Sequence, residues 1–280
     1  MHSVGQPPKD PLTEPGPWNA IAAGYDEVMF GQLPELTDAA IELLAPEKED
    51  TVLDVATGPG TLAVRLAPRV HRVVAVDFAE AMLERLRLHM MQEHLHNLDV
   101  RVMDGQDLQL ESGSFDSAVS LFGLFLFDDR KRGLEELFRV VVPGGRVLIS
   151  SWATPDQNTL LGVGMEAMRA ALPDLPRPEG PLPTQVPATC EAELDAVGFE
   201  SARTQLFKTS VKYASVEEYW RSFERAAAPL AVLKQKLGDA GFASVAERIR
   251  QQLITRLGDG SFSLDCVAIF TLGEVPRSAA

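Results

Sequence analysis

A β-branched, apolar run gives way to a string of small residues at Val52-Leu53-Asp54-Val55-Ala56-Thr57-Gly58-Pro59-Gly60. This pattern predicts a buried strand, a tight turn and the start of a helix. Small residues let the backbone approach a ligand, and a helix N-terminus offers free N–H groups to polar atoms. Asp77 ends the next predicted strand, 17 residues after Gly60 (77 − 60). A carboxylate there can accept hydrogen bonds from both hydroxyls of a ribose, so the pattern indicates a nucleoside site.

Strand and helix patterns alternate beyond this point. Such alternation predicts an α/β, Rossmann-like, doubly wound sheet of mostly parallel strands with helices on both faces. A mainly helical segment, 215–257, broken near Pro229, lies between the last two expected strands. We expect seven strands, at 51–55, 72–77, 100–103, 117–122, 146–150, 199–211 and 261–272, and core helices at 61–67, 79–93 and 130–141.

The flanking segments suggest how one domain is assembled. Five prolines and two glycines within residues 1–17 predict an extended, flexible lead-in. Helical spacing over 18–45, interrupted by Gly31 and Pro34, predicts two helices. We interpret the Pro-rich stretch 173–187 as a surface loop within a single domain over 18–280. Its parts would be a cofactor-binding core (50–155) and a helical cap, made of 18–45 and the lid insertion 215–257, over the carboxyl edge of the sheet.

Composition excludes several classes of function. The 280 residues include 26 Lys and Arg and 40 Asp and Glu, a formal charge of −14. This balance argues against nucleic-acid partners and against anionic membrane surfaces. Two cysteines do not make a disulfide framework, and no apolar run approaches the roughly 18 residues that span a bilayer. The N-terminus lacks signal-peptide features. We expect a cytoplasmic protein without membrane insertion.

Two readings of the glycine-rich turn compete. Gly58 to Ala63 fits the pattern G-x-G-x-x-A, so an NAD(P)-dependent oxidoreductase is one alternative. Asp54 argues against it, because a carboxylate beside a pyrophosphate is unfavourable. The same carboxylate suits a ligand that carries a cationic amine and a sulfonium. The unit also begins only after two predicted helices, which is not typical of the dinucleotide fold.

Five motifs in order resemble those of the class I S-adenosylmethionine-dependent methyltransferases. The resemblance is strongest to the branch with the ubiquinone/menaquinone-biosynthesis C-methyltransferases and natural-product methyltransferases. It covers about residues 18–155, and the remainder agrees only in architecture. Ala56 replaces a common glycine, and Ala79 replaces a serine that would cap a helix. The motifs are Asp54 to Gly60, Asp77 to Leu83, Asp104 to Leu108, Phe115-Asp116 and Arg139 to Arg146.

The resemblance implies roles for individual residues and an antiparallel last strand. Ala56 and Gly58 would lie against the methionine part of the cofactor, and Asp77 would hold the ribose. Met82 would pack on adenine, Asp104 would accept from its amino group, and Gly105 would donate from its backbone. Leu121 and Phe122 would flank the methionine end and the acceptor. The expected cofactor-binding residues are Tyr25, Asp54, Ala56, Gly58, Gly60, Asp77, Phe78, Met82, Asp104, Gly105, Gln106, Leu121 and Phe122.

The implied reaction moves a methyl group from S-adenosylmethionine to a small organic acceptor and leaves S-adenosylhomocysteine. The acceptor would be a carboxylate, an acidic phenol, or a quinol or polyketide carbon, because no histidine stands where a base is needed. Tyr25, Glu166 and Glu224 are the candidate bases. No N-P-P-Y-like element follows the fourth strand, which disfavours methylation of nucleic-acid bases. A protein that binds S-adenosylmethionine without methylating is the second alternative.

Metal binding is not expected. His89, His94 and His96 are separated by five and two residues, so they do not share one helical face. We interpret them as surface histidines. No carboxylate cluster resembles the metal site of catechol-type enzymes. Oligomeric state does not follow from these patterns.

Overall fold

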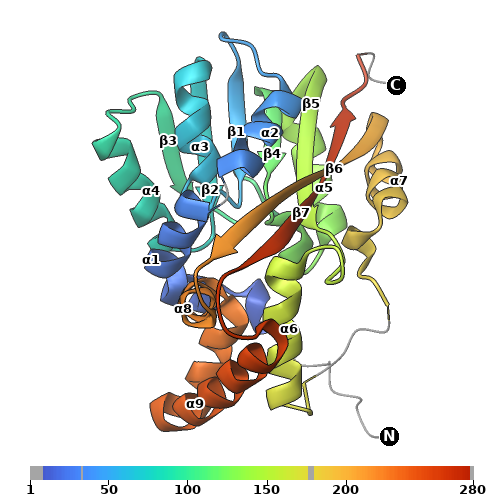
Figure 1. The fold of residues 1–280 in the computed structure, drawn as a ribbon. Coiled ribbons are helices and arrows are strands. Elements are labelled where there is room, and N and C mark those ends of the chain that lie inside the picture. The colour runs from blue at the N-terminus through green and yellow to red at the C-terminus, as the bar shows by residue number, and fades with distance from the viewer. Residues whose placement is uncertain (1–8, 33, 176–179, 278–280) are drawn as a thin grey trace, which may run out of the picture.

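The computed structural model describes residues 9–32, 34–175 and 180–277. It contains the strands β1 (Thr51–Val55), β2 (Arg72–Asp77), β3 (Leu98–Val102), β4 (Phe115–Ser120), β5 (Val141–Trp152), β6 (Glu200–Tyr213) and β7 (Phe262–Glu274). They form one sheet in the order β3-β2-β1-β4-β5-β7-β6 (Figure 1). β7 is antiparallel to β5 and β6, and the other neighbours are parallel. The expected doubly wound sheet with an antiparallel last strand is therefore confirmed.

Helices cover both faces of the sheet. They are α1 (Pro15–Gln32), α2 (Pro34–Leu44), α3 (Thr61–Leu66), α4 (Glu80–Gln92), α5 (Arg130–Val140), α6 (Thr159–Ala171), α7 (Pro187–Val197), α8 (Val216–Ala226) and α9 (Ala228–Leu257). Side chains alternate between the faces of a strand. In β2, Val73 and Ala75 pack in the core with α2, α3 and α4, whereas Val74 and Val76 pack with α5 and α7.

Two elements differ most from the sequence prediction, and β3 and β4 each begin two residues earlier than expected. β5 begins at Val141 because Pro143-Gly144-Gly145 lies inside the strand as a bulge, between the pairs Phe115–Val141 and Ser117–Arg146. Helix α6 was not expected at all. Its Gly162 and Gly164 weaken the helical signal, yet close packing requires them. A Cβ on Gly162 would lie 2.3 Å from the Pro155 carbonyl oxygen, and one on Gly164 would lie 2.6 Å from the Phe223 ring.

The predicted lead-in needs correction where the structure describes it. Residues 1–8 lie outside the described residues. A short 3-10 helix covers Pro11–Thr13, capped by the Asp10 carboxylate, which accepts from the Leu12 N–H at 3.0 Å. α1 already begins at Pro15. Prolines in a first helical turn cost nothing, since the N–H groups there have no partner in the helix. The prolines therefore start structure here instead of extending the chain.

Four helices gather at the carboxyl end of the parallel strands: α1, α6, α8 and α9 (Figure 1). As expected, α8 and α9 follow β6 and precede β7, and the break between them falls at Ala227, two residues before Pro229. α1 contacts α4, α8 and α9. The division into one domain over 18–280 stays a prediction. In the described part of the chain, no helix is long and apolar enough to cross a membrane.

Candidate functional site

A cavity of about 1060 Å³, which includes space open to solvent, lies beneath α1 at the carboxyl ends of β1, β2 and β4. That is the place where open α/β sheets bind ligands. Twelve of the thirteen expected cofactor-binding residues line it: Tyr25, Asp54, Ala56, Gly58, Asp77, Phe78, Met82, Asp104, Gly105, Gln106, Leu121 and Phe122.

The thirteenth, Gly60, has a structural task. Its φ is +86°, and a Cβ there would lie 2.1 Å from Cδ1 of Leu86 on α4. Gly58 also has a positive φ, +56°, but its side-chain position is open, with the Tyr25 ring 3.9 Å away. Gly60 therefore lets α3 and α4 pack closely, whereas Gly58 leaves backbone exposed to the cavity.

Asp77 at the end of β2 organises the turn. Its carboxylate accepts from the Gly58 N–H and from the Ala79 N–H, both at 2.8 Å. Neither bond replaces the helix cap that a serine at position 79 would supply; that acceptor is provided by Asn19, whose side-chain oxygen accepts from the Ala81 N–H at 2.9 Å. Burial raises the pKa of Asp77 to about 6. Both oxygens are thus fixed by protein, and the carboxylate still lines the cavity.

Asp54 at the end of β1 is the most deeply buried acid of the site, at 1% exposure. The Thr57 hydroxyl donates to it at 2.6 Å. Burial, with the charge of Asp77 nearby, raises the pKa of Asp54 to about 7. Two neighbouring carboxylates that are costly to ionise favour a cationic ligand, because a positive charge stabilises their ionised form.

Tyr25 forms part of the roof. It packs with Trp18, edge to face at 6.1 Å between ring centroids, and both belong to a cluster with Phe78 and Met82. Burial, with Asp77 nearby, raises the pKa of Tyr25 to about 12. The phenol therefore stays protonated at neutral pH, so it can donate a hydrogen bond but is a poor base.

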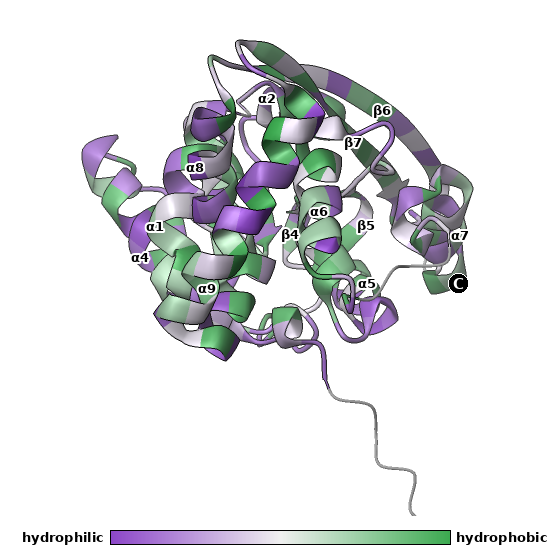
Figure 2. Cartoon of the chain, turned by 60° about the horizontal axis from the view of Figure 1, so that its bottom comes forward, coloured by the Kyte–Doolittle hydropathy of each residue, from purple (hydrophilic) through white to green (hydrophobic). Residues whose placement is uncertain are grey.

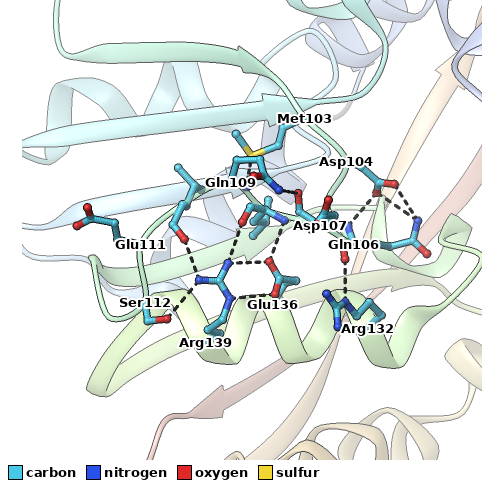
Figure 3. Close-up of polar contacts among 12 residues, drawn as sticks. Met103, Asp104, Gln106, Asp107, Gln109, Glu111, Ser112, Arg132, Glu136 and Arg139 are labelled. Atoms are coloured by element: carbon cyan, nitrogen blue, oxygen red, sulfur yellow. Dashed lines mark hydrogen bonds and ion pairs between the residues drawn. The ribbon is translucent and has the colours of Figure 1, made fainter.

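The loop after β3 carries Asp104, Gly105 and Gln106, and Figure 3 shows its polar contacts. The Gln106 N–H donates to Asp104 at 2.8 Å, and its side-chain oxygen accepts from the Asp129 N–H at 2.7 Å. A Cβ on Gly105 would lie 2.5 Å from the Phe127 ring. The loop is therefore tightly fitted to the segment before α5.

Helix α5 braces the same loop further along. Buried Glu136 accepts from the Leu108 N–H at 2.8 Å, and Arg139 donates to the carbonyls of Leu108 at 2.9 Å and Leu110 at 2.8 Å (Figure 3). Arg139 also pairs with Glu136 and holds the pKa of that carboxyl below its ordinary value. Arg139 is the first residue of the motif Arg139 to Arg146 and lies in the last turn of α5. It thus fixes the loop after β3 that carries Asp104.

The loop after β4 is fixed in a strained shape. Phe122 has φ +57°, its N–H donates to the Ser150 hydroxyl at 2.9 Å, and its ring stacks on Trp152 at 3.7 Å. A Cβ on Gly123 would lie 2.4 Å from the Ala56 Cβ, so the loop fits against the first turn. A left-handed non-glycine residue costs about 1–3 kcal/mol and persists where its surroundings enforce it.

The β4 side of the cavity is apolar. Sequence reasoning missed Met29, Leu36 and Leu62 there, which belong to the same core cluster as Leu121 and Phe122. Of these three, Met29 could have been found from sequence, because the helical spacing of Trp18, Tyr25 and Met29 places them on one face. The charged residues that line the described cavity are all acids: Asp54, Asp77, Asp104 and Asp128.

The other two candidate bases are not brought to the cavity. Glu166 on α6 pairs with Arg169 at 2.8 Å, and Glu224 lies on α8; neither lines the cavity. No histidine lines it within the described residues. In that same part of the chain, no group of three or more His, Cys, Asp or Glu residues could hold a metal ion.

Comparisons with known proteins agree with this geometry. Residues 52–145 match a family model described as a methyltransferase domain. The demethylmenaquinone methyltransferase of Clavibacter sepedonicus is 37% identical over 117 residues, which cover 42% of this chain and 47% of that protein. The ubiquinone/menaquinone biosynthesis C-methyltransferase UbiE of Geotalea daltonii is 31% identical over 157 residues, which cover 51% of this chain and 67% of that protein.

Solved structures extend the likeness of the fold. Phosphoethanolamine N-methyltransferase 2 of Haemonchus contortus superposes with a TM-score of 0.55 at 15% identity, over 92% of this chain and 57% of that one. This likeness concerns the fold alone. The matches to the two curated relatives span about half to two thirds of those proteins.

Proposed function

The chain belongs to the class I S-adenosylmethionine-dependent methyltransferases, and we propose that it transfers the methyl group of S-adenosylmethionine to a small apolar acceptor. The observation that carries this proposal is the pair of buried carboxylates, Asp54 and Asp77, beside the open backbone of Gly58. Asp54 suits a ligand with a cationic amine and a sulfonium and opposes the pyrophosphate of a nicotinamide cofactor, whereas Asp77 suits the ribose that both cofactors carry.

The residues present fit this cofactor. Asp77 would hold the ribose, Met82 would pack on adenine, and Asp104 with Gly105 would meet the adenine edge. Asp54 would face the amine, beneath Tyr25. When bound, the cofactor supplies a methyl group already activated by the sulfonium. The work of the protein is then to orient the acceptor and to exclude water.

The lining also narrows the acceptor. An acceptor with a fixed anionic group would find no cation along the described lining, so a carboxylate is disfavoured. Because Tyr25 stays protonated, the nucleophile must be acidic by itself or be a carbon atom. We therefore infer an acidic phenol, a quinol or an enol, methylated on oxygen or carbon. The names of the two curated relatives, which refer to menaquinone and ubiquinone, support a quinol.

Calorimetry and a radiolabel assay test this proposal. The chain should bind S-adenosylhomocysteine but not NAD(P), and it should move tritium from methyl-labelled S-adenosylmethionine to phenols or quinols but not to aliphatic carboxylates. If NAD(P) stabilises the protein against heat and S-adenosylhomocysteine does not, the proposed methyl transfer is wrong. Binding of S-adenosylhomocysteine with no transfer to any acceptor would identify a non-methylating binding protein.

A further inference from the structure

Helix α1 carries a buried acid on the face beside the one that lines the cavity. The Asp26 side chain is 3% exposed, although it sits one residue after Tyr25. Arg85 Nε donates to one of its oxygens at 2.6 Å, and His89 Nε2 lies 2.7 Å from the other. The Phe30 ring stacks on His89 at 4.1 Å. His89 is thus partly buried and paired, which corrects its interpretation as a surface histidine.

The faces of α1 have separate tasks. Trp18, Tyr25 and Met29 line the cavity. A step of one residue turns the helix by about 100°, and this places Asn19 and Asp26 against α4. There the Asn19 side chain accepts from the Ala81 N–H at 2.9 Å. Figure 2 shows α1 between α4 and α8.

On the α8 side the contact is of another kind. A Cβ on Gly24 would lie 2.6 Å from the Arg225 carbonyl oxygen, so the backbones are close. Glu27 pairs with Arg225 at the surface, where both side chains are about half exposed or more. Exposed ion pairs contribute little. The buried charged contact of α1 therefore lies on the α4 side, at Asp26, whereas on the α8 side the partly buried Gln32 side chain donates to the Ser222 hydroxyl at 3.1 Å.

A buried ion pair adds little net stability, because desolvation offsets the attraction. It instead fixes the position of the helix, because a buried carboxylate must keep both of its hydrogen-bonding partners. The position of α1 matters because Asp54, Asp77 and Met82 are almost fully buried beneath it. Trp18, Tyr25 and Met29 of α1 line the same cavity, so we expect a ligand that reaches these side chains to leave faster when α1 moves away.

We propose that Asp26, acting through Arg85 and His89, is a positioning residue that holds α1 closed over the bound cofactor and sets how fast the cofactor leaves. This inference rests on the proposed function, because the cofactor is the ligand that α1 retains. Asp26 does not line the cavity, so it would act through the helix that carries Tyr25.

The test compares Asp26→Asn with Glu27→Gln in the full chain, with S-adenosylhomocysteine as the probe. Both changes turn an acid of α1 into its amide. We expect Asp26→Asn to raise the dissociation rate, followed by stopped-flow fluorescence, about tenfold or more. Hydrogen exchange of the α1 amides should accelerate while the amides of β1 and β2 keep their protection. Glu27→Gln should stay within about twofold of the wild type, as expected of an exposed pair.

If Asp26→Asn fails to fold, Asp26→Asn with Arg85→Gln removes both charges and takes its place, since the Arg85 side chain already reaches solvent. An unchanged dissociation rate with unchanged exchange in α1 overturns the proposal. Equal loss of protection in the sheet and in α1 also overturns it, because that marks a merely structural residue. If the wild type binds no S-adenosylhomocysteine, the proposed function fails, and the exchange of α1 alone still decides whether Asp26 holds the helix.

Discussion

One side of the cavity, toward β2 and β3, presents the carboxylates of Asp54, Asp77 and Asp104. The other side, toward β4 and α2, presents Met29 and Leu121 with other apolar side chains. The two sides share one space and one roof, yet their chemistry is opposite. The acidic side is costly to the empty protein, because burial raises the pKa of two of its acids, whereas the apolar side is stabilised by burial.

From this contrast we propose that the cofactor binds on the acidic side and the acceptor on the apolar side. The carboxylates of the acidic side gain a favourable partner only when a cation binds, so we expect the cofactor to bind there, at a site that lowers the stability of the empty protein. The apolar side needs no ligand to be stable, so we expect it to select an acceptor by its shape and its apolar surface. Changes on the acidic side should therefore alter both stability and cofactor affinity, whereas changes on the apolar side should lower stability but leave cofactor affinity nearly unchanged.

The largest expected effect is on stability, in Asp54→Asn without ligand. The folded pKa of Asp54, about 7, exceeds its unfolded value, so this group stabilises the fold below about pH 4 and loses that contribution as pH rises through 7. The variant does not ionise, and at pH 8 it should be more stable by on the order of 2 kcal/mol. Urea unfolding at pH 8 and pH 5 measures this. A variant less stable than the wild type at pH 8 would contradict the cost assigned to the acidic side.

Next in size is the loss of cofactor affinity in Asp77→Ala. The change removes the group assigned to the ribose and the acceptor for the Gly58 and Ala79 N–H groups. We expect binding of S-adenosylhomocysteine to weaken at least tenfold, about 1.4 kcal/mol. Isothermal calorimetry measures it, with Asp99→Ala as the control, since Asp99 is a half-exposed acid that pairs with Arg72 on the neighbouring strand. Unchanged affinity in Asp77→Ala would remove the ribose assignment.

A smaller effect is expected from pH. Asp54 and Asp77 become neutral as pH falls through about 7 and about 6, and a neutral acid no longer attracts a cation. Affinity for S-adenosylmethionine should therefore decrease about fivefold from pH 8 to pH 6. Asp54→Asn should flatten this dependence. If the affinity of the wild type rises as pH falls, the cationic group of S-adenosylmethionine does not bind beside Asp54 and Asp77.

The acidic side was readable from sequence because its residues follow strands in contiguous motifs. Asp54, Gly58 and Asp77 stand at strand ends, and strand ends meet at one edge of a parallel sheet. The same reasoning could not distinguish Gly58 from Gly60, because Leu86, the neighbour that decides it, is 26 residues beyond Gly60 (86 − 60).

The roof and the apolar side depend on contacts between distant segments. Asp26 meets Arg85 and His89 at separations of 59 and 63 residues, and nothing local in the sequence shows that this acid is buried. Glu166 and Glu224 were named as candidate bases, but a position in the sequence does not reveal which neighbour a side chain faces. Helix α6 was missed because its glycines serve packing against Pro155 and Phe223, which sequence spacing does not display.

The smallest expected effect sharpens the contrast most. Met29 lies on the same helix as Tyr25 and lines the same cavity, but on the apolar side. Met29→Ala should leave the affinity for S-adenosylhomocysteine within about twofold, because it removes no polar contact and only part of an apolar surface. The same variant should change the ratio of transfer rates between a small phenol and a bulkier quinol, because the space vacated by the side chain lies on the apolar side, where we propose that the acceptor binds. A tenfold loss of cofactor affinity here, comparable to that of Asp77→Ala, would mean that the cofactor extends across both sides and that the acceptor must enter elsewhere.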